Sequence, residues 1–208
     1  SSSLPLSIIG VAGLCSGAGT TQMCIMLAVF MGKVLKKKTA VAGDEVTYSL
    51  MLRQMQKASA IQHKGIASRH AYSMDGIDYY CGIRDEDIGI LRQKYDVIIL
   101  DISFENTFDN TNVTFARMVS RLSACDEKIL AGSMLPWKSR ECEKKMERIE
   151  RFLDIRGLKM VTLAACDKEA VSIIKKHGVE VVLIPFERNP FIISGENLRS
   201  FLELLKIT

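Results

Sequence analysis

Residues 13–22, GLCSGAGTTQ, combine small residues with hydroxyl side chains in an arrangement that suits phosphate binding. A strand-like apolar run, SIIGVA, precedes this loop, and a helix-like apolar run follows it. Backbone N–H groups at the start of a helix bind phosphate oxygens, and a hydroxyl beside them binds Mg²⁺. The pattern therefore predicts a nucleotide phosphate site formed by Ser16, Gly17, Ala18, Gly19, Thr20, Thr21 and Gln22.

The same loop has no lysine at the position where the phosphate-loop pattern GxxxxGK[ST] requires one. That lysine neutralises the outer phosphates of the nucleotide. A glycine-rich turn between a strand and a helix also occurs where the backbone simply needs room. The loop alone therefore leaves two interpretations open, a nucleotide site and a tight turn.

Short apolar runs alternate with helical patterns along the rest of the chain. The predicted strands cover residues 7–12, 39–43, 95–103, 128–133, 159–165 and 179–185, with a hairpin at 70–82 that turns at Asp75-Gly76. The predicted helices cover residues 21–37, 48–56, 85–94, 109–123, 138–154, 167–177 and 195–205. This alternation predicts an α/β fold, a mostly parallel β-sheet with helices on both faces in three α/β/α layers. Ligands of such sheets bind at the carboxyl ends of the strands.

The length of 208 residues fits one α/β domain, which we expect to span residues 7–208, with residues 1–6 as a tag or linker remnant. The net charge of +4 is spread over helical segments such as 33–38, so we expect no specific nucleic-acid partner. No segment reads as a signal peptide, and the apolar run at 23–31 is too short to span a bilayer. We expect a cytoplasmic protein whose membrane contact is absent or indirect.

Six cysteines and three histidines bear on metal chemistry. The cysteines stand singly among apolar residues without a CxxC pair, as buried cysteines of a reducing compartment do. No histidine shares metal-ligand spacing with a cysteine. We therefore expect neither zinc nor an iron–sulfur cluster.

With these elements placed, the loop and the later strand YDVIILD resemble the ParA/MinD division of the P-loop nucleotidases. That division includes the CpaE/TadZ-like proteins, which place pili and secretion machines. Its loop reads KGGxGKTT. When this sequence is laid on it, Gly17 and Gly19 match, Cys15 replaces the signature lysine and Thr20 replaces the Walker lysine. The resemblance implies that Thr21 is the magnesium threonine.

The resemblance extends to residues at the ends of two other strands. Asp101 closes YDVIILD at the position that holds magnesium through water, so Thr21 and Asp101 are the implied metal residues. TAVAGDE lies where the family has an aspartate pair, and Asp44 is the candidate catalytic residue there, with Glu45 as its alternative. Gly43 suggests that this pair is incomplete.

The base pocket is implied by two further segments. The strand VEVVLIP leads into FERNP, and Phe186 and Arg188 of this loop are the implied base-pocket residues. These two residues have an alternative role in holding the last helix in register. The family's asparagine for the base falls near Cys166 and Asp167 and is missing.

The missing lysines set the expected affinity. Each hydrogen bond to a charged group contributes about 1.5–3 kcal/mol, so two lost contacts weaken nucleotide binding by about 10²- to 10⁴-fold. Hydrolysis suffers further, because the same charges stabilise the transferring phosphoryl group. A cation from Lys138, from Arg188 or from a partner chain is the alternative source of charge. ATP with Mg²⁺ stays an open cofactor.

The resemblance implies a localisation or assembly factor for a pilus or secretion apparatus, with weak or absent nucleotide binding. Its implied partners are a second copy of the chain, in a face-to-face homodimer, and a component of that machinery. Two alternatives stay open. One is a slow Mg-ATPase that uses Thr20, Thr21, Asp101 and Asp44 with a borrowed cation, and the other is a nucleotide-independent scaffold.

Three aromatic residues carry further expectations. Trp137, the only tryptophan, stands after Pro136, which opens a helix. Trp137 is either a partner contact or a side chain packed on the sheet edge. Tyr79 and Tyr80 point to opposite faces of one strand, so we expect one to be buried and the other exposed.

Overall fold

The computed structural model describes residues 7–43, 45–53, 55, 58–62, 66, 70–103, 112–163 and 167–207. The described residues form a nine-stranded sheet in the order β3-β4-β5-β2-β6-β1-β7-β8-β9. Its strands are β1 (Ser7–Gly13), β2 (Thr39–Gly43), β3 (Ser59–Ile61), β4 (His70–Met74), β5 (Ile77–Cys81), β6 (Val97–Ser103), β7 (Glu127–Ala131), β8 (Lys159–Thr162) and β9 (Glu180–Leu183).

From β5 to β9 in this order, neighbouring strands pair in parallel. At the other end of the sheet, β3 pairs with β4 and β4 pairs with β5, both antiparallel. The predicted hairpin is confirmed, because β4 and β5 are joined by Asp75 and Gly76, both with positive φ. At the centre of the sheet, β1 lies between β6 and β7, with Val11 opposite Asp101 and Gly13 opposite Ser103. The two central strands therefore end together at one edge.

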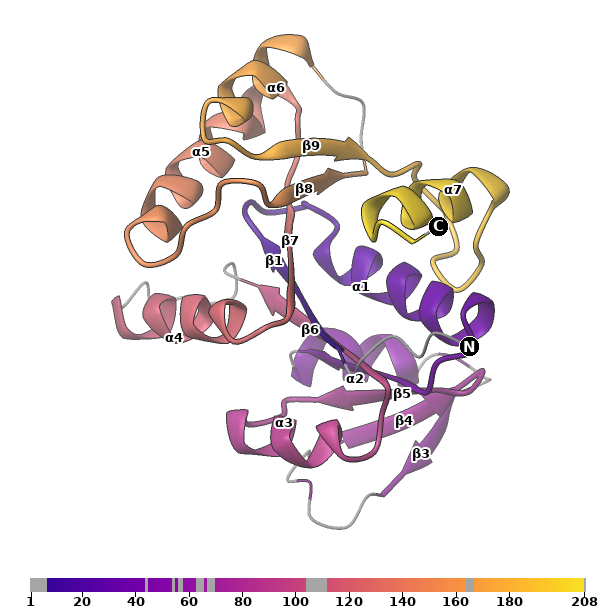
Figure 1. The fold of residues 1–208 in the computed structure, drawn as a ribbon. Coiled ribbons are helices and arrows are strands. Elements are labelled where there is room, and N and C mark those ends of the chain that lie inside the picture. The colour runs from indigo at the N-terminus through magenta and orange to yellow at the C-terminus, as the bar shows by residue number, and fades with distance from the viewer. Residues whose placement is uncertain are drawn as a thin grey trace.

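Helices cover both faces of the sheet, as predicted, and Figure 1 shows α3, α4, α5 and α6 on one side and α1 and α7 on the other. The helices are α1 (Thr20–Val29), α2 (Glu45–Arg53), α3 (Asp85–Arg92), α4 (Asn112–Ser123), α5 (Pro136–Glu150), α6 (Lys168–Lys175) and α7 (Gly195–Leu204). Among the residues that the structure describes, no helix is both long enough and apolar enough to cross a membrane.

The first helix is buried almost all round. Residues 23–31 are all buried, because α1 lies against the sheet on one side and beneath α7 on the other. Phe30 stacks on Phe201 of α7, with ring centroids 5.4 Å apart. A helix that is apolar on every side is typical of this buried position. After Val29 the chain continues as a short π-helix, η1 (Phe30–Val34), so the helical segment ends three residues before the predicted residue 37.

Most predicted elements are present with shifted ends. The largest shift is in α2, which was predicted at 48–56 and begins at Glu45, and the short edge strand β3 was not predicted. Residues 109–111 of one predicted helix and 164–165 of one predicted strand lie outside the described residues, as do residues 1–6. The predicted α/β class is confirmed by the parallel central strands and the helices on both sides.

The expectation for the two tyrosines of β5 is wrong, because Tyr79 and Tyr80 are both fully buried. The two side chains do point to opposite faces of the sheet, but other residues cover the sheet on both faces. Tyr79 meets Phe191 edge-on, with centroids 6.4 Å apart. Tyr80 meets Tyr95, their hydroxyl oxygens lie 2.6 Å apart, and the Tyr95 hydroxyl donates to Asp78 at 2.6 Å.

These buried hydroxyls predict a loss of stability at alkaline pH. Burial raises the pKa of Tyr80 to about 12, and it also raises the pKa of Tyr79 and Tyr95 above the usual value. In the unfolded chain tyrosine ionises near pH 10, so stability is complete below that pH and falls as pH rises above it. Each such tyrosine should lower the free energy of unfolding by about 1 kcal/mol between pH 9 and pH 11.

Urea unfolding of the wild type and of Tyr79→Phe at the two pH values measures this effect. No described residue pairs with the Tyr79 hydroxyl, so the substitution removes a titrating group without breaking a hydrogen bond there. We expect a smaller alkaline loss in Tyr79→Phe. Equal losses in the two proteins would contradict the role of Tyr79.

Candidate functional site

The candidate site lies where the carboxyl ends of β1, β6, β7 and β8 meet the start of α1. The loop between β1 and α1 runs over residues 14–19, as predicted. Gly17 and Gly19 have left-handed backbone angles, with φ of 73° and 77°. A side chain at Gly19 would also overlap Leu163, so this position requires glycine for two reasons.

The start of α1 is open to an anion. Gly19 is the N-cap residue, no side chain caps the helix, and its first turn contains no acidic residue. The first N–H groups of a helix carry partial positive charge, and an anion stabilises them when no cap does. The backbone N–H groups that could bind a phosphate are therefore present at the start of α1.

Thr20, at the position of the Walker lysine, has a different environment. The side chain is buried and its hydroxyl lies against Gly13, where an added Cβ would overlap it. A short neutral side chain tucked over the end of β1 supplies no charge to a phosphate. Cys15, at the position of the signature lysine, is also buried. Its hydrogen bond with the Cys142 thiol of α5 lowers the pKa of Cys15 against the opposing effect of burial.

Thr21 and Asp101, the implied metal residues, are brought together by the structure. The Thr21 hydroxyl donates to Asp101 Oδ2 at 2.7 Å. A hydroxyl and a carboxylate are ligands that Mg²⁺ accepts, so this pair fits a magnesium ion. Within the described segments, no group of three or more His, Cys, Asp or Glu side chains could hold a metal.

Tyr48 of α2, which sequence reasoning missed, also contacts Asp101. Its hydroxyl donates to the same Asp101 oxygen at 3.0 Å, and its ring lies over Gly43 at the end of β2. A side chain at Gly43 would overlap this ring. Gly43 is therefore explained by the packing of Tyr48. Asp44, the candidate catalytic residue, lies outside the described residues.

The surroundings of Asp101 keep the neighbouring groups neutral. Burial, followed by the charge of Asp101, raises the pKa of both Tyr48 and Cys24 well above the usual values. Two protonated, buried groups thus face the carboxylate, and Tyr48 remains a hydrogen-bond donor. The Asp101 oxygen that faces Thr21 accepts two hydroxyl donors.

The glycine loop is covered by the first turns of α5. Ser16 N–H donates to Glu141 Oε1 at 3.2 Å, so a carboxylate of the chain itself contacts the loop backbone. Lys138 Nζ lies 3.0 Å from Glu141 Oε2 and 3.5 Å from Ser16 Oγ. Burial opposes the effect, but the bonds from Lys138 and Ser16 N–H lower the pKa of Glu141 below its ordinary value. Glu141 therefore remains an anion at neutral pH.

Glu141 was not predicted from the sequence. Its only signal was the i, i+3 spacing from Lys138 on a helix that follows a strand end. Lys138 itself was one of the two predicted sources of a replacement charge, and the structure places its amine at the loop. Arg188, the other source expected within this chain, is exposed, and among the described residues no contact brings it to the loop.

A hollow of about 190 Å³ opens beside the loop. Its lining comes from the loop and from the ends of β7, β8 and β9, namely Gly17, Ala18, Gly19, Gln22, Gly132, Ser133, Thr162, Leu163 and Phe186. The buried Thr162 hydroxyl has no hydrogen-bond partner among the described residues. Small-molecule sites usually have about 300–1,000 Å³, so the hollow fits a phosphate group better than a whole nucleotide.

Phe186, one of the two implied base-pocket residues, lines the hollow, and the loop at 185–191 that carries it is held by hydrogen bonds. Gln22 Nε2 donates to the Glu187 carbonyl at 2.6 Å, and Asn197 of α7 donates to the Glu187 carboxylate at 3.0 Å. Gln22 thus holds the chain in register. Phe186 is 62% exposed at the rim of the hollow.

Trp137 is 73% exposed, so packing on the sheet edge is the wrong interpretation. Pro136 does open α5, as predicted. The tryptophan adjoins Lys138 at the start of this helix and faces solvent. It therefore adds an apolar ring to the surface beside the loop.

The residues present fit the family's ligand in part. Thr21, Asp101 and the uncapped start of α1 suit magnesium and a phosphate group. The loop segment 14–22 contains no lysine, and it has an acidic residue at its backbone. The arrangement can therefore hold a metal or a small anion more readily than a triphosphate.

Comparison with protein-family models and with curated proteins finds no match to the sequence. Comparison with solved structures finds extensive similarity. MinD cell division protein of Aquifex aeolicus has a TM-score of 0.66 and 13% identity, over 97% of this chain and 98% of that chain. The septum site-determining protein MinD of Pyrococcus horikoshii, complexed with Mg-ADP, has a TM-score of 0.59 and 15% identity, over 95% and 93%.

A third similar structure is a plasmid partition protein of Borrelia burgdorferi bound to AMPPNP. Its TM-score is 0.58 and its identity 16%, over 98% of this chain and 99% of that chain. These similarities extend over nearly the full length on both sides. The identities are low, so they establish the fold alone. The chain has the three-layer α/β fold of the MinD and ParA-type P-loop ATPases.

Proposed function

We propose that this chain is a ParA/MinD-like localisation or assembly factor whose nucleotide site binds nucleotide weakly or not at all. The observation that carries the proposal is the contact of the Glu141 carboxylate with the Ser16 N–H. An incoming phosphate must displace an anion that already uses the loop backbone, or bind beside it against like-charge repulsion. The missing lysine removes the charge that would offset this cost.

The environment of Asp101 supports the same proposal. Thr21 and Asp101 would hold the magnesium ion that accompanies a nucleotide, and that ion would offset part of the phosphate charge. In this chain, the Tyr48 hydroxyl takes up hydrogen-bonding capacity of the Asp101 oxygen that also accepts from Thr21. A metal bound directly at this oxygen would compete with the Thr21 hydroxyl and with the buried Tyr48 phenol, whose ring is packed over Gly43. The strand-end loops are then more useful as a protein contact surface.

One observation favours the alternative of a slow Mg-ATPase. Lys138 Nζ lies 3.5 Å from Ser16 Oγ, so a cation from α5 is available at the loop. This cation pairs with Glu141 at 3.0 Å, and a nucleotide must draw it away from that partner. In this alternative Lys138 replaces the Walker lysine, and Thr21 and Asp101 hold magnesium.

Calorimetric titration with ATP and ADP in the presence of Mg²⁺ tests the proposal, using the wild type, Thr20→Lys and Thr20→Met. We expect weak or no binding by the wild type and by Thr20→Met. The lysine variant should gain about 10- to 150-fold in affinity, because one charge-assisted contact contributes about 1.5–3 kcal/mol. The methionine variant controls for side-chain length.

Micromolar binding of Mg-ATP by the wild type would contradict the proposal. If Lys138→Ala then abolished that binding together with slow hydrolysis, the ATPase alternative would replace it. The scaffold alternative predicts no binding by any of the three proteins.

The role of Glu141 has its own test. Glu141→Gln keeps the size of the side chain and removes the charge beside the Ser16 N–H. We expect its affinity for Mg-ATP to rise by about tenfold, in line with the cost of a like-charge neighbour at close range. Glu147→Gln on the exposed face of α5 is the matched control, and its affinity should not change. If Glu141→Gln and Glu147→Gln bound Mg-ATP with equal affinity, the charge of Glu141 would not be a cause of the weak nucleotide binding.

Two exposed aromatic residues support a protein partner at this face. Trp137 stands at the start of α5 beside Lys138, and Phe186 stands at the rim of the hollow. Exposed aromatic side chains, tryptophan above all, are enriched at the energetic centres of protein interfaces. The pilus or secretion partner and the cytoplasmic location implied by the resemblance belong to this proposal, as does a homodimer through this face.

Sedimentation equilibrium over a range of protein concentrations tests that surface. We expect a concentration-dependent dimer whose dissociation constant rises about tenfold or more in Trp137→Ala, as for a hot-spot residue. Phe152→Ala is the control, because Phe152 is 64% exposed but follows the opposite end of α5. A wild-type monomer at every concentration, or equal weakening by both variants, would contradict a homodimer through Trp137.

A further inference from the structure

A second hollow is lined by residues of α3 and α4. These two helices lie on the side of the sheet opposite α1 (Figure 1). The volume of this hollow is about 450 Å³, more than twice that of the hollow at the glycine loop. Ile8 of β1, Leu100 of β6 and Cys125 after α4 contribute apolar groups to its lining. Burial raises the pKa of Cys125 to about 11, so its thiol is neutral at physiological pH.

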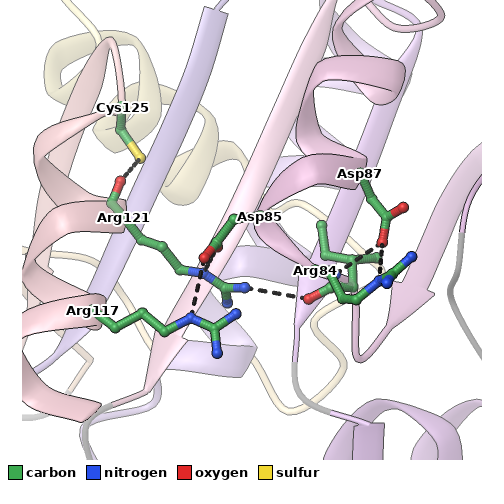
Figure 2. A network of polar contacts seen from close by, with 7 residues as sticks. Arg84, Asp85, Asp87, Arg117, Arg121 and Cys125 are labelled. Carbon is green, nitrogen blue, oxygen red and sulfur yellow. Dashed lines mark hydrogen bonds and ion pairs between the residues drawn. The ribbon is translucent and has the colours of Figure 1, made fainter. Parts of the chain in front are cut away.

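The lining is rich in guanidinium groups. Arg117 and Arg121 of α4 both bind Asp85 at the start of α3, Arg117 with an N–O distance of 3.1 Å. Figure 2 shows the two arginines converging on this one carboxylate. Arg92 at the end of α3 also lines the hollow and lies 3.5 Å from Asp126. The lining thus contains three arginines and a single carboxylate, Asp85.

The arginines differ in how many of their donors are used. Arg121 binds Asp85 and also donates to the Ile83 carbonyl at 3.3 Å, so it is fixed between the two helices. Arg117 uses Nε for Asp85, and within the described part of the chain its terminal nitrogens contact no acceptor. A guanidinium offers five N–H donors in a planar fork that matches a carboxylate or phosphate. Arg117 therefore has donors available for an anion.

Gly89 keeps the hollow open. It lies in the interior of α3, lines the hollow, and a Cβ added there would meet no atom within 4 Å. Glycine in a helix interior is less favourable than alanine, and no close packing explains its presence here. The missing side chain leaves free space beside the arginines.

We propose that the α3–α4 hollow binds a small organic anion. The carboxylate or phosphate group of this ligand contacts Arg117 and Arg92, and its apolar body lies on Ile8, Leu100 and Cys125. The volume lies within the range of small-molecule sites, which are mainly apolar with a few polar groups that fix orientation. Charge complementarity selects an anion. This inference is independent of nucleotide binding at the glycine loop.

Titration with the fluorescent dye anilinonaphthalenesulfonate, an anion with an apolar body, tests this site. We expect saturable binding at one site, and displacement of the dye by octanoate or octyl phosphate. Displacement by one of the two identifies its head group as the preferred one. Arg117→Gln should weaken dye binding about tenfold, as loss of a charge-assisted contact does. Arg199→Gln on the exposed face of α7 removes the same charge elsewhere and should bind as the wild type does.

Gly89→Leu fills the hollow from within α3 and should abolish dye binding. The substitution improves helix propensity, so the fold should persist, and an unchanged far-ultraviolet circular dichroism spectrum checks this. Dye binding that is equal in the wild type, Arg117→Gln and Gly89→Leu would overturn the proposal. Occupation of the hollow by an acidic helical peptide, with no binding of dye, octanoate or octyl phosphate, would also overturn it.

Discussion

The structure depends on the parallel pairing of β1 with β6 at the centre of the sheet. Parallel strands are joined by crossover helices, so both faces of such a sheet must be covered and its strands become apolar throughout. The pairing also brings the carboxyl ends of β1 and β6 to the same edge, with Gly13 opposite Ser103. The glycine loop, the Thr21–Asp101 contact and the hollow beside them all follow from that alignment.

The sequence predicted those features that depend on strand order and local spacing. The Asp75-Gly76 turn, the buried strand that contains Asp101 and the glycine-rich loop before α1 could all be predicted, because each depends on a few adjacent residues. Tyr48 and Glu141 could not, because their contacts depend on how α2 and α5 rotate and tilt against the sheet. The prediction for the two β5 tyrosines was wrong for a related reason. The alternation of side chains along a strand shows which face of the sheet each one points to, but not whether a helix or loop covers that face.

The site combines the strand-end geometry of the MinD and ParA-type fold with side chains that, in our proposal, disfavour a nucleotide. Thr20 and Cys15, which the resemblance lays on the two lysine positions, are turned inward, where Thr20 lies against Gly13 and Cys15 contacts Cys142. The groups that remain at the loop come from α5, and they are a paired cation and anion. Such a surface has little net charge to attract a triphosphate. Its exposed aromatic rings suit a protein better.

The contact between Ser16 and Glu141 has a consequence for α5 as a whole. The helix is anchored to the core by Cys142, Met146 and Ile149, and its first turn begins with Pro136 and the exposed Trp137. Whatever competes for the Ser16 N–H also releases Glu141, and whatever holds the first turn of α5 also holds Glu141 on the loop. If a partner at Trp137 stabilises the position of Glu141 on the loop, a ligand of the Ser16 N–H must, by thermodynamic linkage, weaken that partner's binding by the same factor.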